Sequence, residues 1–321
     1  MEWYIGMDLG GTKCAAGIVD SEGRLLARDS IRTGAHRPAR EILGDMAEQA
    51  MRLAETLGAD RTRLRGIGIG SPGTPDNRRG VVLYSSNLPF RADTAIRDAL
   101  TARTGLPVHL ENDAACAALA EARVGAARGM PDAVTLTLGT GVGCGMVLSG
   151  RIYHGFNNAA GEFGHSVLVP GGEPCPCGRR GCFEQYASAT ALIRETRRAM
   201  ARRPASLLHK FAREEGKVSA RTAFEAMRAG DAAAKEVVTD YIRMLSEGVT
   251  NLVNILMPSI LLVGGGVSNE GESLLAPVRA YVEEHAYYGE NVPHTQIALA
   301  SLGNEAGIIG AALMAAEPDA G

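Results

Sequence analysis

Residues 8–26 read DLGGTKCAAGIVDSEGRLL, and residues 137–153 read TLGTGVGCGMVLSGRIY. Each stretch predicts a strand, a turn of glycine and threonine, a second strand, a glycine turn and a third strand. The same plan therefore occurs twice, as an internal repeat on the scale of a domain. We expect an α/β protein whose two duplicated domains flank a cleft.

The rest of the chain alternates between helical and strand patterns. In residues 38–57 the hydrophobic side chains recur with the period of a helix. We expect a small domain of residues 1–115 and 302–321 and a large domain of residues 116–301. Further helices are predicted at 92–104, 114–126, 188–203, 219–228, 231–256, 270–286 and 304–316, and further strands at 66–70, 107–113, 259–263 and 295–300.

Composition and charge exclude several classes of protein. The chain has 321 residues, 45% of them hydrophobic and 21% charged, the mixture found in soluble globular proteins. The net charge of −3 gives no long basic face, so we expect no nucleic acid partner. The chain has no run of 18 apolar residues, and its first residues lack the pattern of a signal peptide. We therefore expect no membrane span and a cytoplasmic location.

A histidine and three cysteines lie close together in residues 161–184, GEFGHSVLVPGGEPCPCGRRGCFE. His165, Cys175, Cys177 and Cys182 are the ligand types of a structural zinc site, held here by short turns. In a reducing cytosol, clustered cysteines bind metal or do redox work more often than they form crosslinks. The cluster therefore predicts a Zn²⁺ site, with free buried thiols or redox work as the alternatives.

Two carboxylates, Glu162 and Glu184, bracket this cluster. A bound metal would fix both carboxylates and the imidazole, and such a set can grip a ligand with many hydroxyl groups. The remaining cysteines, Cys14, Cys116 and Cys144, lie among small apolar residues and are expected in the core.

Two glycine-rich turns carry groups that suit phosphate oxygens. In residues 8–13, DLGGTK, the glycines allow close approach of an anion, Thr12 offers a hydroxyl and Lys13 a positive charge. Asp8 can hold the water shell of Mg²⁺. Residues 139–143, GTGVG, are the equivalent turn of the second copy. Each alone fits an ordinary hairpin turn and neither is a Walker A loop, but their equivalent places in a repeat favour phosphate binding.

Asn112 and Asp113 lie where a predicted strand ends and a helix begins. Asp113 could simply cap the helix. It also lies at the carboxyl end of a strand, where α/β sheets bind ligands. There it could take a proton from a substrate hydroxyl that attacks a phosphorus. Both interpretations are open on these residues alone.

Six motifs follow one another along nearly the whole chain: DLGGTK (8–13), END (111–113), TLGTGVG (137–143), GEFGH (161–165), CPCGRRGCFE (175–184) and LLVGGGV (261–267). In this order they resemble the ROK family of bacterial sugar kinases and repressors. The pair GEFGH and CPCGRRGCFE is highly specific. The wider relatives are the hexokinase–actin–Hsp70 superfamily, whose duplicated actin-like, ribonuclease H-like domains agree with the repeat.

The resemblance implies a role for each position. Asp113 is similar to the family's catalytic base, which acts on a sugar hydroxyl. The implied metal ligands are His165, Cys175, Cys177 and Cys182. The implied sugar ligands are Gly73, Asn87, Asn112, Asp113, Glu162, His165 and Glu184. The implied ATP and phosphate contacts are Asp8, Gly10, Gly11, Thr12, Lys13, Gly139, Thr140, Gly141, Gly143, Gly264, Gly265 and Gly266, the last three in the turn that approaches adenosine.

The resemblance also implies the activity. The domains would close on a sugar and Mg-ATP, exclude water and phosphorylate a hexose, most readily glucose to glucose 6-phosphate. A kinase of an N-acetylhexosamine (GlcNAc or ManNAc), fructose or allose is the alternative, and polyphosphate is an alternative donor. Zinc would be structural, Mg²⁺ would accompany ATP, and the family expectation is a homodimer.

One stretch departs from the family's glucokinases. The run NLPGW is common in those enzymes, and this chain has Phe90 and Arg91 in place of its glycine and tryptophan. The resemblance therefore implies a hexose as the substrate more firmly than it implies glucose in particular. A sugar-responsive repressor would carry a helix-turn-helix domain before the first core strand, which is predicted here at Trp3. A sugar-binding protein without catalysis is a third class, and the presence of Asp8 and Asp113 argues against it.

Overall fold

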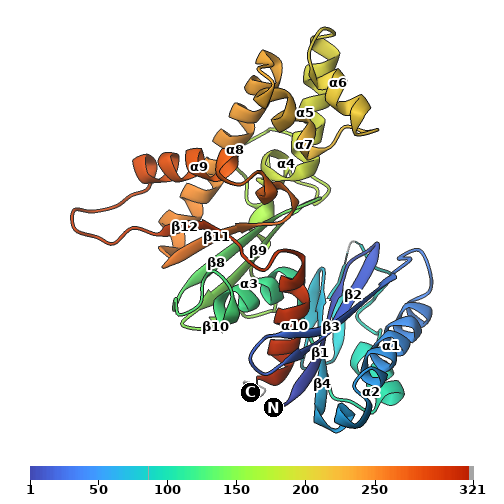
Figure 1. Ribbon diagram of the computed structural model, residues 1–321. Coiled ribbons are helices and arrows are strands. Elements are labelled where there is room, and N and C mark those ends of the chain that lie inside the picture. Colours follow the sequence, from blue (N-terminus) through green and yellow to red (C-terminus); the bar gives the residue numbers. More distant parts are fainter. Residues whose placement is uncertain (86, 318–321) are drawn as a thin grey trace. The chain divides into compact units, whose positions relative to one another are not determined.

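The computed structural model describes residues 1–85 and 87–317, which form an α/β fold with two five-stranded sheets (Figure 1). The strand order is β3-β2-β1-β4-β7 in the first sheet and β10-β9-β8-β11-β12 in the second. The two orders correspond strand by strand, so the predicted duplication is confirmed. The first sheet contains β1 (Trp3–Leu9), β2 (Lys13–Asp20), β3 (Leu25–Arg32), β4 (Leu64–Ser71) and β7 (Val108–Asn112). The second contains β8 (Ala133–Leu138), β9 (Val142–Leu148), β10 (Arg151–Ile152), β11 (Ile260–Gly264) and β12 (Gln296–Leu299).

The chain divides into two compact units. Unit 1 comprises residues 1–135, 145–161 and 301–321, and unit 2 comprises residues 136–144 and 162–300. Residues 116–135 and 145–161 lie in unit 1. The helix of residues 113–124 packs there against the C-terminal helix. The two helices approach so closely that a Cβ at Gly310 would lie 1.7 Å from the carbonyl oxygen of Cys116.

Helices cover both faces of the first sheet in unit 1. On one face, Ile5, Met7 and Leu9 of β1 pack into a buried core with α1 (Ala39–Glu55) and α2 (Ile96–Thr104). The alternate residue Tyr4 belongs to a second core, formed with α3 (Asp113–Val124) and α10 (Ala306–Ala316). This alternation follows from the two-residue period of a strand. The strands β1, β4 and β7 are parallel, so their carboxyl ends meet at one edge, where Ser71 of β4 is opposite Asn112 of β7.

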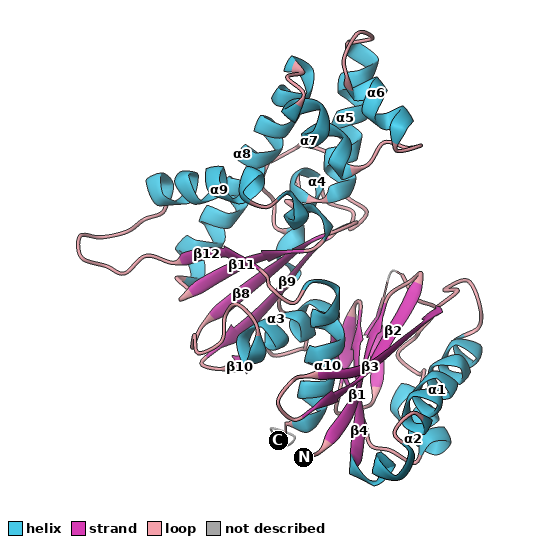
Figure 2. Ribbon diagram, in the orientation of Figure 1, coloured by secondary structure: helices cyan, strands magenta, loops and turns pink. Residues whose placement is uncertain are grey.

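Helices dominate unit 2 (Figure 2). Three of them begin at a polar side chain that accepts a backbone N–H: Ser188 before α5, Ser219 before α7 and Asp231 before α8. Such caps satisfy donors that a helix otherwise leaves unpaired. The helices are α4 (Glu184–Ala187), α5 (Ala189–Arg202), α6 (Leu208–Glu214), α7 (Ala220–Arg228), α8 (Ala232–Leu256) and α9 (Glu272–His285).

Only short elements were absent from the sequence-based expectations, which found the long helices and strands to within a few residues. The short elements are the hairpin of β5 (Thr74–Asp76) and β6 (Val81–Tyr84), the helices α4 and α6, and the 3₁₀ turns η1 (Gly58–Arg63), η2 (Glu162–His165), η3 (Gly266–Glu270) and η4 (Gly303–Glu305). Elements of this length show too few periods for a pattern to be recognised.

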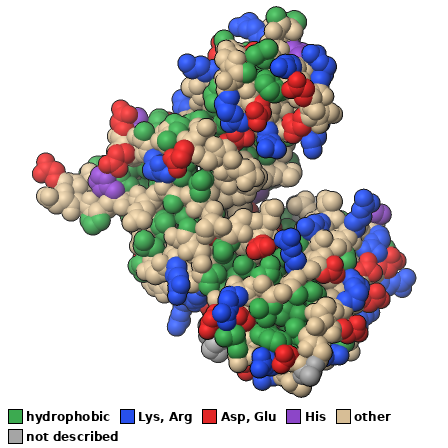
Figure 3. All heavy atoms as spheres, in the orientation of Figure 1, with side chains coloured by type: hydrophobic (Ala, Val, Ile, Leu, Met, Phe, Trp, Pro, Cys, Tyr) green, Lys and Arg blue, Asp and Glu red, His purple; other side chains and the backbone are tan. Residues whose placement is uncertain are grey.

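The surface carries both signs of charge. On the face shown in Figure 3, the basic and acidic side chains are interspersed, in agreement with the small net charge. Among the described residues, none of the helices combines the length and the apolar character that a membrane crossing needs.

Candidate active site and metal centre

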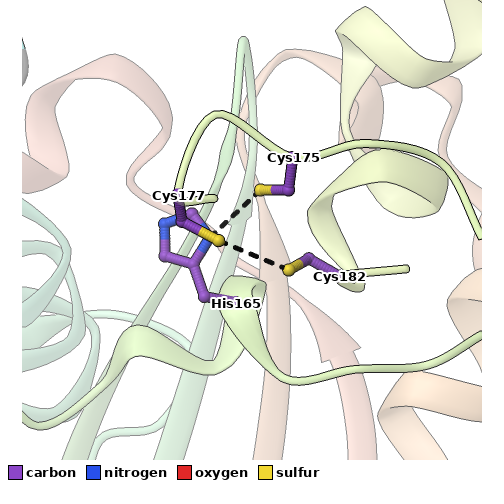
Figure 4. A group of neighbouring side chains, drawn as sticks. All are labelled: His165, Cys175, Cys177 and Cys182. Atoms are coloured by element: carbon purple, nitrogen blue, oxygen red, sulfur yellow. Dashed lines mark hydrogen bonds between the residues drawn. The ribbon is translucent and has the colours of Figure 1, made fainter. Parts of the chain in front are cut away.

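The structure brings His165, Cys175, Cys177 and Cys182 together in unit 2 (Figure 4). One ligand atom from each lies within 4.8 Å of all the others. The Sγ atoms of Cys177 and Cys182 are 3.6 Å apart, and the Cys175 Sγ lies 3.6 Å from His165 Nδ1. Four ligands about 2.0 to 2.3 Å from one ion at tetrahedral angles have nearly these separations. The four residues therefore fit a tetrahedral metal ion that would be held by three thiolates and one imidazole from one short segment.

The segment that carries these ligands is anchored by two aromatic rings. Phe183 follows the last cysteine and is fully buried. Its ring meets Phe163 edge to face, with centroids 5.3 Å apart. It also lies against Gly248 of α8, where an added Cβ would come within 2.2 Å of the ring. Packing on both sides fixes the chain on either side of the metal ligands.

Both implied sugar carboxylates of unit 2 lie next to this centre. The Glu162 Oε2 is 3.9 Å from His165 Nε2. His165 thus turns Nδ1 toward the cysteines and Nε2 toward Glu162. Glu184, two residues after Cys182, accepts a hydrogen bond from the backbone N–H of Val142, with an N···O distance of 3.0 Å. The sequence did not suggest this link between the cysteine segment and the second glycine turn.

The second glycine turn, residues 139–143, connects β8 and β9. The segment after Glu184 holds it at two more points: the Ala189 N–H bonds to the Gly139 carbonyl, and the Thr190 hydroxyl donates to the Thr140 carbonyl at 2.7 Å. A side chain at Gly141 would strike the Glu184 carboxylate, 2.4 Å away. The metal ligands, Glu184 and this turn therefore form one connected piece of unit 2.

The implied adenosine turn, residues 264–266, follows β11 in the same unit. Gly265 has a φ of 85°, and a Cβ there would lie 2.6 Å from backbone atoms of Leu138. Only glycine meets both requirements without strain. The structure thus brings this turn beside the end of β8, directly before Gly139 and Thr140.

In unit 1, Asn112 ends β7 and Asp113 begins α3. Asn112 caps the helix, because its Oδ1 accepts the N–H groups of Ala114 and Ala115, and its Nδ2 donates to the Gly73 carbonyl. Capping was one interpretation of Asp113 from sequence, and the structure assigns it to Asn112. Asp113 is therefore a partly buried carboxylate beside the cap, with one oxygen accepting the Ala114 N–H at 2.9 Å.

The pKa values of Asp113 and Asp8 are both raised. Burial raises the pKa of Asp113, although backbone N–H groups oppose the rise. Burial, and next the charge of Asp113, raise the pKa of Asp8 to about 6, while Lys13 opposes the rise. A pair of carboxylates held at a raised pKa without a structural partner is typical of a functional site.

The other implied contacts of unit 1 lie near this pair. Gly11 of the first turn packs against Asn87, whose carbonyl oxygen would lie 3.1 Å from a Cβ at Gly11. Gly73 has a φ of 97° and its carbonyl receives the Asn112 side chain. Its Cβ position is 2.0 Å from the Tyr84 carbonyl, so no side chain fits there.

Two residues that depart from the NLPGW run have different surroundings. Phe90 is 1% exposed and belongs to the core of unit 1. Arg91 is exposed, and its backbone N–H donates to Thr94. Phe90 therefore contributes to the hydrophobic core of unit 1.

The sequence did not predict one pair of side chains close to Asp113. The Glu111 carboxylate precedes Asn112 and is buried, and its Oε2 lies 2.6 Å from Nε2 of His154. No spacing rule connects residues 43 positions apart, so the sequence contained no signal for this contact.

The family model described as the ROK family matches residues 4–317, so the chain belongs to the ROK family. It is similar to a glucokinase of Halalkalibacterium halodurans, with 36% identity over 309 residues that cover 96% of this chain and 93% of the relative. The predicted family is confirmed.

Solved structures agree. A ROK family glucokinase from Streptomyces griseus in complex with glucose and AMPPNP has a TM-score of 0.84 and 38% identity, covering 98% of this chain and 100% of that one. A ROK hexokinase from Thermus thermophilus has a TM-score of 0.79 and 38% identity, covering 97% of each chain. The predicted fold class, α/β with duplicated actin-like domains, is confirmed.

Proposed function

We propose that this protein is an ATP-dependent hexose kinase that converts glucose to glucose 6-phosphate. The observation that carries the proposal is the Asp113 carboxylate, partly buried at the start of α3, with a raised pKa and no salt-bridge partner among the described residues. The similarity to glucokinases, one of them solved with glucose and an ATP analogue, supports this activity and this substrate.

Asp113 acts as the base. It accepts the proton of the sugar hydroxyl as the hydroxyl oxygen forms a bond to the γ-phosphorus and the bond from that phosphorus to the bridging oxygen of ADP breaks. A raised pKa suits this step, because a stronger base takes the proton more readily. Asn112 orients Asp113 through its cap and keeps one Nδ2 hydrogen for the sugar.

The remaining proposed sugar contacts are Gly73, Asn87, Glu162, His165 and Glu184. The two glycine turns contribute backbone N–H groups to the phosphates, and Asp8 and Lys13 flank the first turn. Mg²⁺, when bound with ATP, would offset charge on the phosphates, and Asp8 would hold its water shell. The implied phosphate and adenosine contacts are Gly10, Gly11, Thr12, Lys13, Gly139, Thr140, Gly141, Gly143, Gly264, Gly265 and Gly266.

The four-residue cluster holds Zn²⁺ in this proposal. Zinc, when bound, is a structural crosslink, since all four tetrahedral positions have protein ligands. His165 would hold the ion through Nδ1, which leaves Nε2 for the sugar, and Glu184 lies two residues after Cys182. The protein acts as a homodimer in the cytoplasm, as expected from its family.

The test is ADP release with Mg-ATP over glucose, mannose, fructose, allose, GlcNAc and ManNAc. Sugar-phosphate formation is measured over the same panel with polyphosphate as a second donor. We expect glucose with ATP to give the highest kcat/KM. A higher value for another sugar would keep the mechanism and replace the substrate. No turnover with any combination, for folded protein with zinc bound, would refute the kinase and leave a sugar-binding protein.

A further inference from the structure

Glu111 is a buried carboxylate that phosphoryl transfer does not require. It lies at the end of β7, immediately before Asn112 and Asp113, and is 7% exposed. Burial of a carboxylate is costly unless hydrogen bonds compensate it. Its two oxygens therefore need partners, and the structure gives one to each.

The partners lie on different parts of unit 1. Oε1 accepts the backbone N–H of Asn112 at 2.7 Å. Oε2 lies 2.6 Å from Nε2 of His154, and because a carboxylate only accepts, the imidazole is the donor. The hydrogen bond to Glu111 raises the pKa of His154, which favours the protonated ring.

His154 is itself held in place. It follows β10, its carbonyl oxygen accepts the N–H of Ala160, and the neighbouring Tyr153 N–H bonds to Met146 of β9. His154 thus begins a loop of residues 154–160, and the hydrogen bond from the Ala160 N–H to the His154 carbonyl joins the two ends of this loop. Glu111 connects the start of this loop, through His154, to the backbone N–H of Asn112, the residue before Asp113.

We propose that His154 is a positioning residue for the reaction: through Glu111 it fixes the backbone of Asn112 and so the orientation of Asp113. The inference rests on the proposed kinase function, since it assigns His154 to the same site. Without the imidazole, the Glu111 carboxylate is buried with a charge that has lost its partner, and it turns away from Asn112. Asp113 is then less well aligned with the sugar hydroxyl, which lowers kcat more than it lowers substrate affinity.

The test compares His154→Phe, Glu111→Leu and the double variant in the full-length, zinc-loaded protein. We expect His154→Phe to lower kcat with glucose about tenfold, with KM for ATP within twofold of wild type. The melting temperature should also fall, because the Glu111 carboxylate stays buried without its partner. The double variant should be no slower than Glu111→Leu, because both changes break one connection. His154→Gln, which keeps an N–H donor, should recover part of the loss.

The matched control is His294→Phe, because His294 also bonds a glutamate, Glu283, through Nδ1 at 2.9 Å, but on an exposed part of unit 2. It should leave kcat unchanged. The inference is overturned if His154→Phe keeps kcat within twofold, or if its loss adds independently to that of Glu111→Leu.

A second measurement separates this inference from the proposed function. If wild-type protein phosphorylates no sugar, the kinase proposal fails. Hydrogen exchange of residues 108–114 then tests whether His154 fixes the backbone of Asn112 through Glu111. Faster exchange of this segment in His154→Phe, with the rest of the protein unchanged, supports the connection through Glu111. Unchanged exchange overturns it.

Discussion

Asp8 makes the free protein less stable at neutral pH, so Asp8→Asn should stabilise it there. The carboxyl is partly buried, and burial and the charge of Asp113 raise its pKa to about 6, against 3.8 for an ordinary aspartate. A raised pKa means that the folded state holds the proton more tightly than the unfolded state. Stability is therefore greatest below the unfolded pKa and is lost as pH rises through the folded value. A difference of about two pKa units corresponds to about 3 kcal/mol.

The assay follows unfolding in urea by the fluorescence of Trp3, the single tryptophan, which lies on the same strand as Asp8. We compare the free energy of unfolding of Asp8→Asn with that of wild type. Between pH 5 and 7.5 this difference should shift in favour of the variant by about 1.4 kcal/mol, roughly half of the full effect. Asp29→Asn is the control, because Asp29 lies on β3 of the same sheet but is more exposed and paired with Arg52. A gap that stays constant with pH, or moves toward wild type, would refute the reasoning.

Three further predictions concern metal, nucleotide and packing. Cys182→Ser should lose zinc, measured by metal analysis, and lower the melting temperature, because three ligands hold a structural ion poorly; full zinc occupancy would contradict the assigned ligands. Thr190→Val removes the hydrogen bond to the Thr140 carbonyl in the second glycine turn and should raise KM for ATP two- to fivefold, with KM for glucose unchanged. Equal effects on both KM values would count against a role of this turn in binding the nucleotide alone. Gly310→Ala should lower the free energy of unfolding in urea by more than about 2 kcal/mol, because its Cβ would lie 1.7 Å from the Cys116 carbonyl oxygen of α3. The control Gly44→Ala has open space at its Cβ and should raise the free energy of unfolding by about 0.5 to 1 kcal/mol. Similar values for both variants would show that helix propensity outweighs the close approach.

The fold could be predicted from sequence because its elements are long and its repeat is explicit. The stretch that begins at Asp8 and the stretch that begins at Thr137 contain the same succession of strands and turns, and each became the antiparallel side of a five-stranded sheet. The hairpin at 74–84 and the one-turn helix at Glu184 could not be predicted, because so few residues show no periodicity.

The candidate site divides in the same way. The four candidate metal ligands are recognisable because they are close in sequence and chemically distinctive, and the structure brings them together. The contact between Glu111 and His154 depends on how unit 1 folds and has no local signature. The individual roles of the sugar and phosphate residues, the identity of the metal as zinc, the domain boundaries, the homodimer and the cytoplasmic location stay predictions.

The most direct test of the central claim is the rate of glucose 6-phosphate formation by wild type and by Asp113→Asn, with Mg-ATP and saturating glucose. The substitution keeps the shape of the side chain and removes the base. We predict one ADP for each glucose 6-phosphate in wild type, and a kcat lowered by about 10² to 10⁴ in the variant, with glucose still bound. A variant that keeps kcat within tenfold of wild type would contradict the assignment of Asp113 as the base.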